Sequence, residues 1–131
     1  MGTLKGEVAL ASVLLVDSDK NHKQHFTNIL NHLGHNVVYD TNTLYDLVEY
    51  CTKYKPDYIC IDLFVEATYH RRRFQSSLSS VIEKIKEHKL NLKIIIMTPY
   101  DMENTIIEML KAGADDYLFQ PISMNDMKRV F

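Results

Sequence analysis

The sequence predicts one α/β domain in which a parallel sheet lies between two layers of helices. Three observations lead to this fold class. The length of 131 residues suits a single domain with a substantial core. Five short apolar runs recur along the chain, and segments with helical spacing alternate with them. Such alternation is typical of a doubly wound sheet with right-handed crossover connections.

Nearly unbroken apolar runs predict the strands. Four clear runs and one weaker one lie at residues 13–16 (VLLV), 58–61 (YICI), 94–97 (IIIM), 117–119 (YLF) and, weaker, 36–39 (NVVY). Runs without polar alternation suit strands that are buried on both faces, as in a parallel sheet.

Apolar residues at helical spacing predict the helices between these strands. The four stripes consist of Phe26, Ile29, Leu30 and Leu33; Leu44, Leu47, Val48 and Cys51; Leu78, Val81, Ile82 and Ile85; and Met102, Ile106, Met109 and Leu110. Each stripe places one apolar face against the sheet. Gly34 and Gly113 stand where a left-handed C-terminal cap is expected, and Pro56 separates the second helix from the third strand. Residues 125–131 allow about two turns of a short last helix.

Composition excludes several classes of protein. The net charge of -2 and a pI near 6.3 give no electrostatic footprint for nucleic acid or for an anionic membrane. The apolar stretch at residues 8–16 is too short to span a bilayer. Cys51 and Cys60 form neither a C-x-x-C pair nor a disulfide framework, which favours buried thiols and a cytoplasmic location. We expect a tail at residues 1–11 and the folded domain at residues 12–131.

Polar residues end the predicted strands. Asp17 ends the first strand, Asp62 the third and Thr98 the fourth, and Gln120 with Pro121 follows the fifth. In a doubly wound sheet, ligands bind beyond the carboxyl ends of the strands. Two carboxylates that meet at one edge are costly unless a cation or a proton lies between them, and hard oxygen ligands select Mg²⁺ or a similar ion.

With these residues in place, the sequence resembles the receiver domain of two-component response regulators. The matching stretches are VLLVDSDK (13–20), PDYICIDLF (56–64), IIIMTPYD (94–101) and AGADDYLFQPIS (112–123). The resemblance implies a flavodoxin-like (βα)5 fold with strand order 2-1-3-4-5. It also implies a module of phosphorelay signalling rather than a turnover enzyme.

Residue roles follow from the resemblance. Asp62 matches the phosphoacceptor, which takes a phosphoryl group from a histidine kinase or a phosphotransfer protein. Family Mg²⁺ ligands carry over to Asp17, Asp62 and the backbone carbonyl of Phe64. Thr98 matches the hydroxyl residue that binds the phosphoryl group, and Tyr117 matches the aromatic residue that follows its movement. The implied output surface, which could also form a homodimer, consists of the fourth helix, fifth strand and fifth helix.

The sequence departs from the family in three places. Ser18 stands where a second acidic residue is usual, so we expect weak Mg²⁺ binding unless the loop lets Asp19 compensate. Gln120 stands where a Lys is usual, which removes a positive charge and predicts weaker switching. A longer loop after Asp62 carries Arg71, Arg72 and Arg73. One of these could approach the phosphoryl site and replace the missing Lys charge, the cluster could mark a docking surface, or the loop could simply be basic and solvated.

Other interpretations stay open. In one, the fold is kept without the chemistry, as a phosphorylation-independent pseudo-receiver that acts through protein contacts or dimerisation. In the other, the fold belongs to a flavin or nucleotide enzyme, but the loop DSDKNHK has no glycine to let backbone amides approach a phosphate.

Individual residues also have simpler interpretations. Asp17 could cap a helix, and Thr98 could be an ordinary turn residue. His25 and His32 lie two turns apart, too far to chelate one ion, so we interpret the histidines between His22 and His35 as solvated surface.

Overall fold

The chain folds into alternating strands and helices, as the sequence predicts. The computed structural model describes residues 10–63, 65, 78–99 and 102–131. The elements are β1 (Ser12–Val16), α1 (Lys20–His32), β2 (Asn36–Thr41), α2 (Leu47–Tyr54), β3 (Tyr58–Asp62), α4 (Leu78–Glu87), β4 (Lys93–Thr98), α5 (Glu103–Ala112), β5 (Asp116–Phe119) and α6 (Met124–Val130). Among the described residues, every helix is too short or too polar to cross a membrane.

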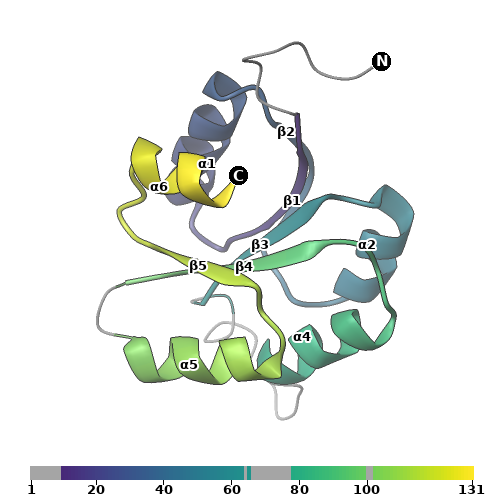
Figure 1. Cartoon of the computed structure of the whole chain (residues 1–131). Coiled ribbons are helices and arrows are strands. Elements are labelled where there is room, and N and C mark those ends of the chain that lie inside the picture. The colour runs from purple at the N-terminus through teal and green to yellow at the C-terminus, as the bar shows by residue number, and fades with distance from the viewer. Residues whose placement is uncertain (1–9, 64, 66–77, 100–101) are drawn as a thin grey trace.

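The five strands form one parallel sheet of order β2-β1-β3-β4-β5, which confirms the predicted topology. Helices α1 and α6 cover one face of the sheet, and α2, α4 and α5 cover the other (Figure 1). The sheet is therefore the middle layer of three.

Alternate residues of each central strand enter two separate cores. In β1, Leu14 and Val16 pack toward α2 and α4, whereas Val13 and Leu15 pack toward Phe26 of α1. These four side chains of β1 are fully buried. Strands that are apolar at every position are thus explained by burial on both faces.

The two glycines that follow α1 and α5 adopt the predicted positive φ, whereas the second helix begins later than predicted. Gly34 and Gly113 adopt φ values of +91° and +128°, a region that L side chains rarely enter. The second helical stripe was expected to include Leu44, but α2 begins at Leu47 because Asp46 adopts a left-handed φ of 59°. Leu44 is still buried, from the turn before the helix.

Both cysteines are free and buried in the cores, as predicted. Burial raises the pKa of the Cys51 thiol to about 11 and also raises the pKa of Cys60. Both thiols therefore stay protonated at neutral pH and act as small apolar side chains.

His35 is a buried histidine at the start of the sheet. Only 4% of it is exposed, and its Nδ1 accepts a hydrogen bond from the Ala11 N–H at 3.1 Å. Burial lowers the pKa of His35, because the charged imidazolium loses its hydration. Burial therefore favours the neutral form of His35, and its interpretation as solvated surface is wrong.

We predict that His35 makes the fold sensitive to acid. In the unfolded chain the pKa of His35 is near 6.5. As the pH falls, the unfolded chain therefore takes up a proton on His35 at a higher pH than the folded chain does. The stabilisation is present above pH 6.5 and is lost as the pH falls from 6.5 through the folded-state pKa. Urea unfolding at several pH values should give a steeper acid loss for the wild type than for His35→Gln. Parallel curves for the two proteins would contradict this role.

Candidate functional site

Three buried polar side chains meet at the carboxyl edge of the sheet. Asp17 directly follows β1, Asp62 ends β3 and Thr98 ends β4, with 0%, 2% and 0% of their surfaces exposed. The strands β1 and β3 pair in register from Val13 with Tyr58 to Val16 with Ile61, so the two carboxylates follow neighbouring paired residues. The structure therefore brings Asp17 and Asp62 together, as the sequence predicts.

Backbone and side-chain hydrogen bonds fix Asp17. Its N–H donates to the Thr41 carbonyl at 3.0 Å, which ties it to the end of β2. One carboxylate oxygen, Oδ1, accepts the Asp19 N–H at 2.9 Å, and the other contacts the ring of His22. Asp17 thus sits where β1 turns into α1, with both oxygens engaged.

The cap of α1 is Asp19, not Asp17. The Asp19 carboxylate accepts the His22 N–H at 3.0 Å and closes the first turn of the helix. Asp19 is exposed and engaged at the cap, and the cluster of possible metal ligands does not include it. The expected compensation for the missing second acid therefore does not come from Asp19 in this arrangement.

His22 is a site residue that the sequence analysis missed. Its Nδ1 faces Asp17 Oδ2, and its Nε2 lies 2.8 Å from the Gln120 side-chain nitrogen. One ligand atom from each of Asp17, His22 and Asp62 lies within 4.8 Å of the others. The signal was the spacing, since a histidine three residues after the cap Asp19 lies in the first helical turn, beside the strand end.

The interpretation as solvated surface is correct for His25 and His32, which are exposed on α1. It is wrong for His22, whose side chain is 19% exposed. The three differ because His22 lies on the turn of α1 next to the sheet edge, whereas His25 and His32 face outward.

Electrostatics favour a protonated His22. The hydrogen bond to Asp17 raises the pKa of His22 most, burial opposes it, and the charges of Asp17, Asp62 and Asp19 raise it further. A Gln amide presents N–H on one side and oxygen on the other, so after rotation Gln120 can also accept from the imidazolium. The surroundings of His22 therefore stabilise its charged form, at a site where Gln120 carries no charge.

Gln120 is held against the end of β4. Its backbone N–H donates to the Thr98 carbonyl at 2.8 Å, and the peptide bond to Pro121 is cis. The Thr98 hydroxyl donates to the Pro99 carbonyl at 3.2 Å. Three strand ends and the first turn of α1 thus enclose the site.

The donor set fits Mg²⁺ only in part. The carboxylates of Asp17 and Asp62 are oxygen ligands, which Mg²⁺ prefers, but Ser18 is exposed and His22 contributes nitrogen. The Phe64 carbonyl, expected as a third ligand, lies outside the described residues, as do Arg71, Arg72 and Arg73.

Tyr117, the expected switch residue, lies half-buried on β5. Its ring packs edge-on against Phe119, with 5.1 Å between the ring centroids. The neighbouring Asp116 forms an ion pair with Arg129 of α6 at 3.1 Å. Asp116 is therefore paired locally and does not join the site.

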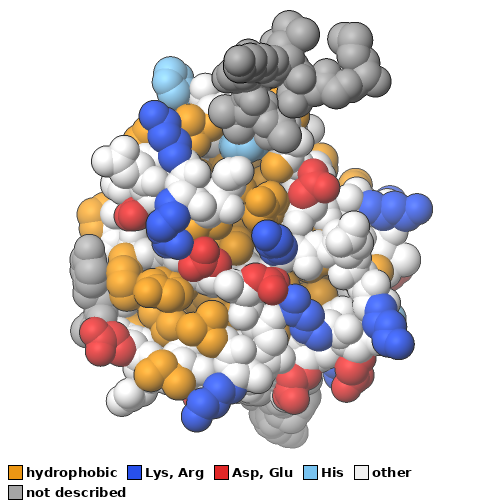
Figure 2. Space-filling view, in the orientation of Figure 1, with side chains coloured by type: hydrophobic (Ala, Val, Ile, Leu, Met, Phe, Trp, Pro, Cys, Tyr) orange, Lys and Arg blue, Asp and Glu red, His pale blue; other side chains and the backbone are white. Residues whose placement is uncertain are grey.

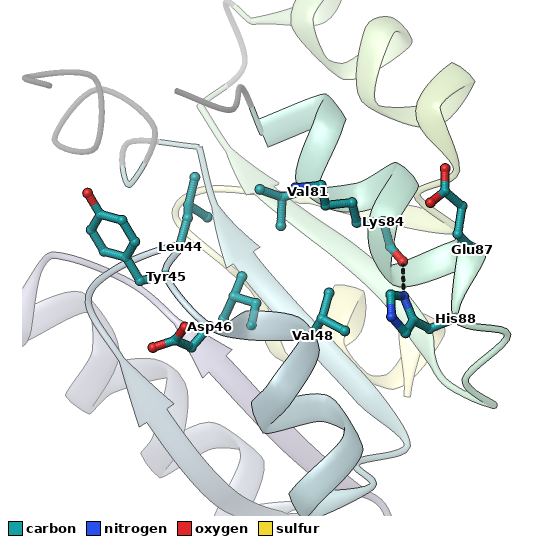
Figure 3. Close-up of a pocket in the computed structure, with 9 residues that line it drawn as sticks. Leu44, Tyr45, Asp46, Val48, Val81, Lys84, Glu87 and His88 are labelled. Atoms are coloured by element: carbon teal, nitrogen blue, oxygen red, sulfur yellow. Dashed lines mark hydrogen bonds between the residues drawn. The ribbon is translucent and has the colours of Figure 1, made fainter. Parts of the chain in front are cut away.

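In the part of the chain that the structure describes, two surface grooves lie outside this buried cluster. One, of about 470 Å³, runs between α2 and α4, where Val48 lies opposite Val81 and His88 contacts the Lys84 carbonyl (Figure 3). None of the strand-end residues lines it. The other, of about 500 Å³, reaches Ser18 and is lined by the polar side chains of α1 and β2. Only the second groove adjoins the site.

The 2-1-3-4-5 parallel sheet, with buried Asp17 after β1, Asp62 at the end of β3 and Thr98 at the end of β4, agrees with the arrangement that the resemblance to receiver domains implies. Residues 79–131 match the sequence model of the response regulator receiver domain. The predicted relation to response regulator receivers is confirmed.

Curated relatives point to the same class. The chain is 28% identical to the two-component response regulator-like protein APRR3 of Arabidopsis thaliana, over 91% of this chain and 23% of that protein. It is 27% identical to the transcriptional regulatory protein ZraR of Klebsiella oxytoca, over 88% of this chain and 24% of that protein. With the chemotaxis protein CheY of Thermotoga maritima it shares 25% identity over 83% of this chain and 84% of that protein. The chain spans about a quarter of the length of the first two relatives.

Solved structures confirm the fold. NtrX from Brucella abortus superposes with a TM-score of 0.76 at 16% identity, covering 93% of this chain and 26% of the other. A two-component response regulator of the LuxR family from Aurantimonas sp. gives a TM-score of 0.74 at 16% identity, covering 92% and 81%.

We predict that His22 titrates above its ordinary pKa of 6.5 because its ring bonds to Asp17. The Asp17–His22 pair then contributes stability that is fully present below pH 6.5 and lost as the pH rises through the folded-state pKa. NMR titration of the ring should show a lower His22 pKa in Asp17→Asn than in the wild type. Asp40→Asn, which removes an exposed carboxylate paired with Lys23, is the matched control and should leave His22 unchanged. An identical His22 titration in all three proteins would refute the pairing.

Proposed function

We propose that this receiver domain accepts a phosphoryl group on Asp62 from a histidine kinase or a phosphotransfer protein. The observation that carries the proposal is the burial of Asp62 at the carboxyl end of β3, beside Asp17 and His22. The relation to response regulators supports phosphorelay signalling as the general role. In this role the domain is a signalling module rather than a turnover enzyme.

The chemistry is a transfer between two nucleophiles. An Asp62 carboxylate oxygen forms a bond to phosphorus while the P–N bond of the donor phosphohistidine breaks. The donor imidazole leaves with the electron pair of that bond and takes up a proton. Asp62 becomes an acyl phosphate and carries more negative charge than the carboxylate did.

Neighbouring groups can receive that added charge. The Thr98 hydroxyl, which donates to the Pro99 carbonyl, can turn to donate to a phosphoryl oxygen. His22 and Gln120 stand on the side where the family usually has a Lys, and a protonated His22 restores the positive charge. Asp17 and Asp62 would hold Mg²⁺, which would neutralise the phosphoryl oxygens, but we propose weak binding because Ser18 adds no carboxylate.

The proposed output surface combines α5, β5 and α6. Ile107 and Leu110 of α5 are 50% and 36% exposed, and Tyr117 and Phe119 lie half-buried on β5. Hydrophobic side chains gather over this part of the molecule (Figure 2). An exposed apolar patch of this kind suits a protein partner or a second copy of the chain.

One observation favours a second candidate function. Asp62 is 2% exposed, and His22 together with Gln120 occupies the space beside Asp17. A site already balanced by its own imidazolium suits a pseudo-receiver, which acts through protein contacts or dimerisation without phosphorylation.

We predict that incubation with Mg²⁺ and acetyl phosphate adds one phosphoryl group to the chain. Intact-mass spectrometry should detect this adduct on the wild type and not on Asp62→Asn, which keeps the size of the side chain but removes the nucleophile. Absence of the adduct from the wild type, with Mg²⁺ in excess, would leave the pseudo-receiver in its place.

We also predict that Ser18→Asp tightens Mg²⁺ binding, because it restores a carboxylate directly after Asp17. Hard oxygen ligands favour Mg²⁺, so isothermal titration should show roughly tenfold higher affinity. Ser18→Asn is the matched control, with the same size and no charge. Equal affinities for the two variants would place position 18 outside the metal site.

A further inference from the structure

We propose that His22 is a metal ligand, and that Asp17, His22 and Asp62 form a site for a divalent transition metal ion of the Zn²⁺ class rather than a site built for Mg²⁺. The inference deepens the metal binding within the proposed function and uses the same site. It does not require that Asp62 be phosphorylated.

The first argument is geometric. Two ligands on one ion are about 3–4 Å apart, because each bond to Zn²⁺ is about 2.0–2.2 Å long. The ligand atoms of Asp17, His22 and Asp62 all lie within 4.8 Å of one another. Small side-chain rotations would therefore bring all three onto one ion, with water completing the coordination.

The second argument is the orientation of the imidazole. A histidine that binds a metal usually has its other ring nitrogen hydrogen-bonded, which fixes the ring and its tautomer. His22 has this arrangement, since Nδ1 faces Asp17 while Nε2 contacts the Gln120 amide at 2.8 Å. Gln120 holds the ring with a neutral amide that can turn its oxygen to accept the Nε2 proton, whereas a Lys has no acceptor.

The third argument is ligand chemistry. Imidazole nitrogen suits Zn²⁺, Co²⁺ and Ni²⁺, whereas Mg²⁺ takes oxygen ligands in near-ideal octahedral geometry. This site offers an imidazole, and it lacks the second acid at Ser18 that would favour Mg²⁺. The carboxylates of Asp17 and Asp62 are almost fully buried and add two oxygen ligands beside this imidazole. Binding of a transition metal ion would release the proton that His22 shares with Asp17, so His22 would bind as a neutral imidazole.

The test uses metal-free full chain with three titrants: Zn²⁺, Mg²⁺ and Co²⁺ as a spectroscopic probe. Wild type should bind one Zn²⁺, and His22→Gln should weaken Zn²⁺ binding roughly tenfold or more. Mg²⁺ binding should not weaken in His22→Gln. Co²⁺ should give visible d–d absorption bands whose position and intensity change in His22→Gln. His25→Gln, an exposed histidine one turn along α1, is the matched control for adventitious surface binding.

Two further variants keep the test decisive. Gln120→Ala leaves every ligand in place and should weaken Zn²⁺ binding less than His22→Gln does. Circular dichroism of each variant shows whether it is folded, and should His22→Gln not fold, His22→Asn takes its place. Equal Zn²⁺ affinity in wild type and His22→Gln, or equal losses in His22→Gln and His25→Gln, would overturn the inference.

The outcomes separate this inference from the proposed function. A Mg²⁺-dependent phosphoryl adduct together with His22-independent Zn²⁺ binding would overturn the metal site and leave the phosphoacceptor in place. His22-dependent Zn²⁺ binding without any adduct would support the metal site and remove the phosphoacceptor role.

Discussion

Two carboxylates buried side by side at the end of a parallel sheet form the constraint on which this site depends. Asp17 and Asp62 follow adjacent paired strands and are 0% and 2% exposed, so neither can be solvated like a surface acid. Two like charges that are buried together are costly unless a proton or a cation lies between them. Each buried charge also needs hydrogen bonds to replace the hydration that it loses. The elements around the pair place an imidazole, His22, against Asp17 and a side-chain amide, Gln120, against that imidazole.

Helix α1 meets this requirement through its first turn. Asp19 caps the helix and the cap places His22 against Asp17, so the capping interaction that starts the helix also positions the imidazole. On the opposite side, the backbone bond from Gln120 to Thr98 fixes Gln120 at the end of β4, within reach of the same ring. The site is therefore assembled from local capping and sheet register, without any long loop among the described residues.

The sequence predicts the fold well because its strongest signals are local. Runs such as residues 94–97 are apolar at every position, and only a strand buried on both faces explains them. The positions of Asp17, Asp62 and Thr98 follow from strand order alone. His22 could not be found in this way, because a histidine within a polar helix start resembles a solvated residue until packing places it near Asp62. Leu44 shows the same limit, because the left-handed conformation of Asp46 delays the start of α2 to Leu47 and leaves Leu44 outside the helix.

Formal charge explains why the departures occur together. In the family pattern, three carboxylates and one lysine leave a net charge of about minus two, which one divalent ion neutralises. When His22 binds a metal ion as the neutral ligand proposed above, Asp17 and Asp62 also carry two negative charges, so one divalent ion again gives neutrality. Losing an acid at Ser18 and a cation at Gln120 therefore preserves the charge balance, whereas either change alone would not. In the metal site that we propose, the imidazole would favour an ion that accepts nitrogen ligands over a hard cation.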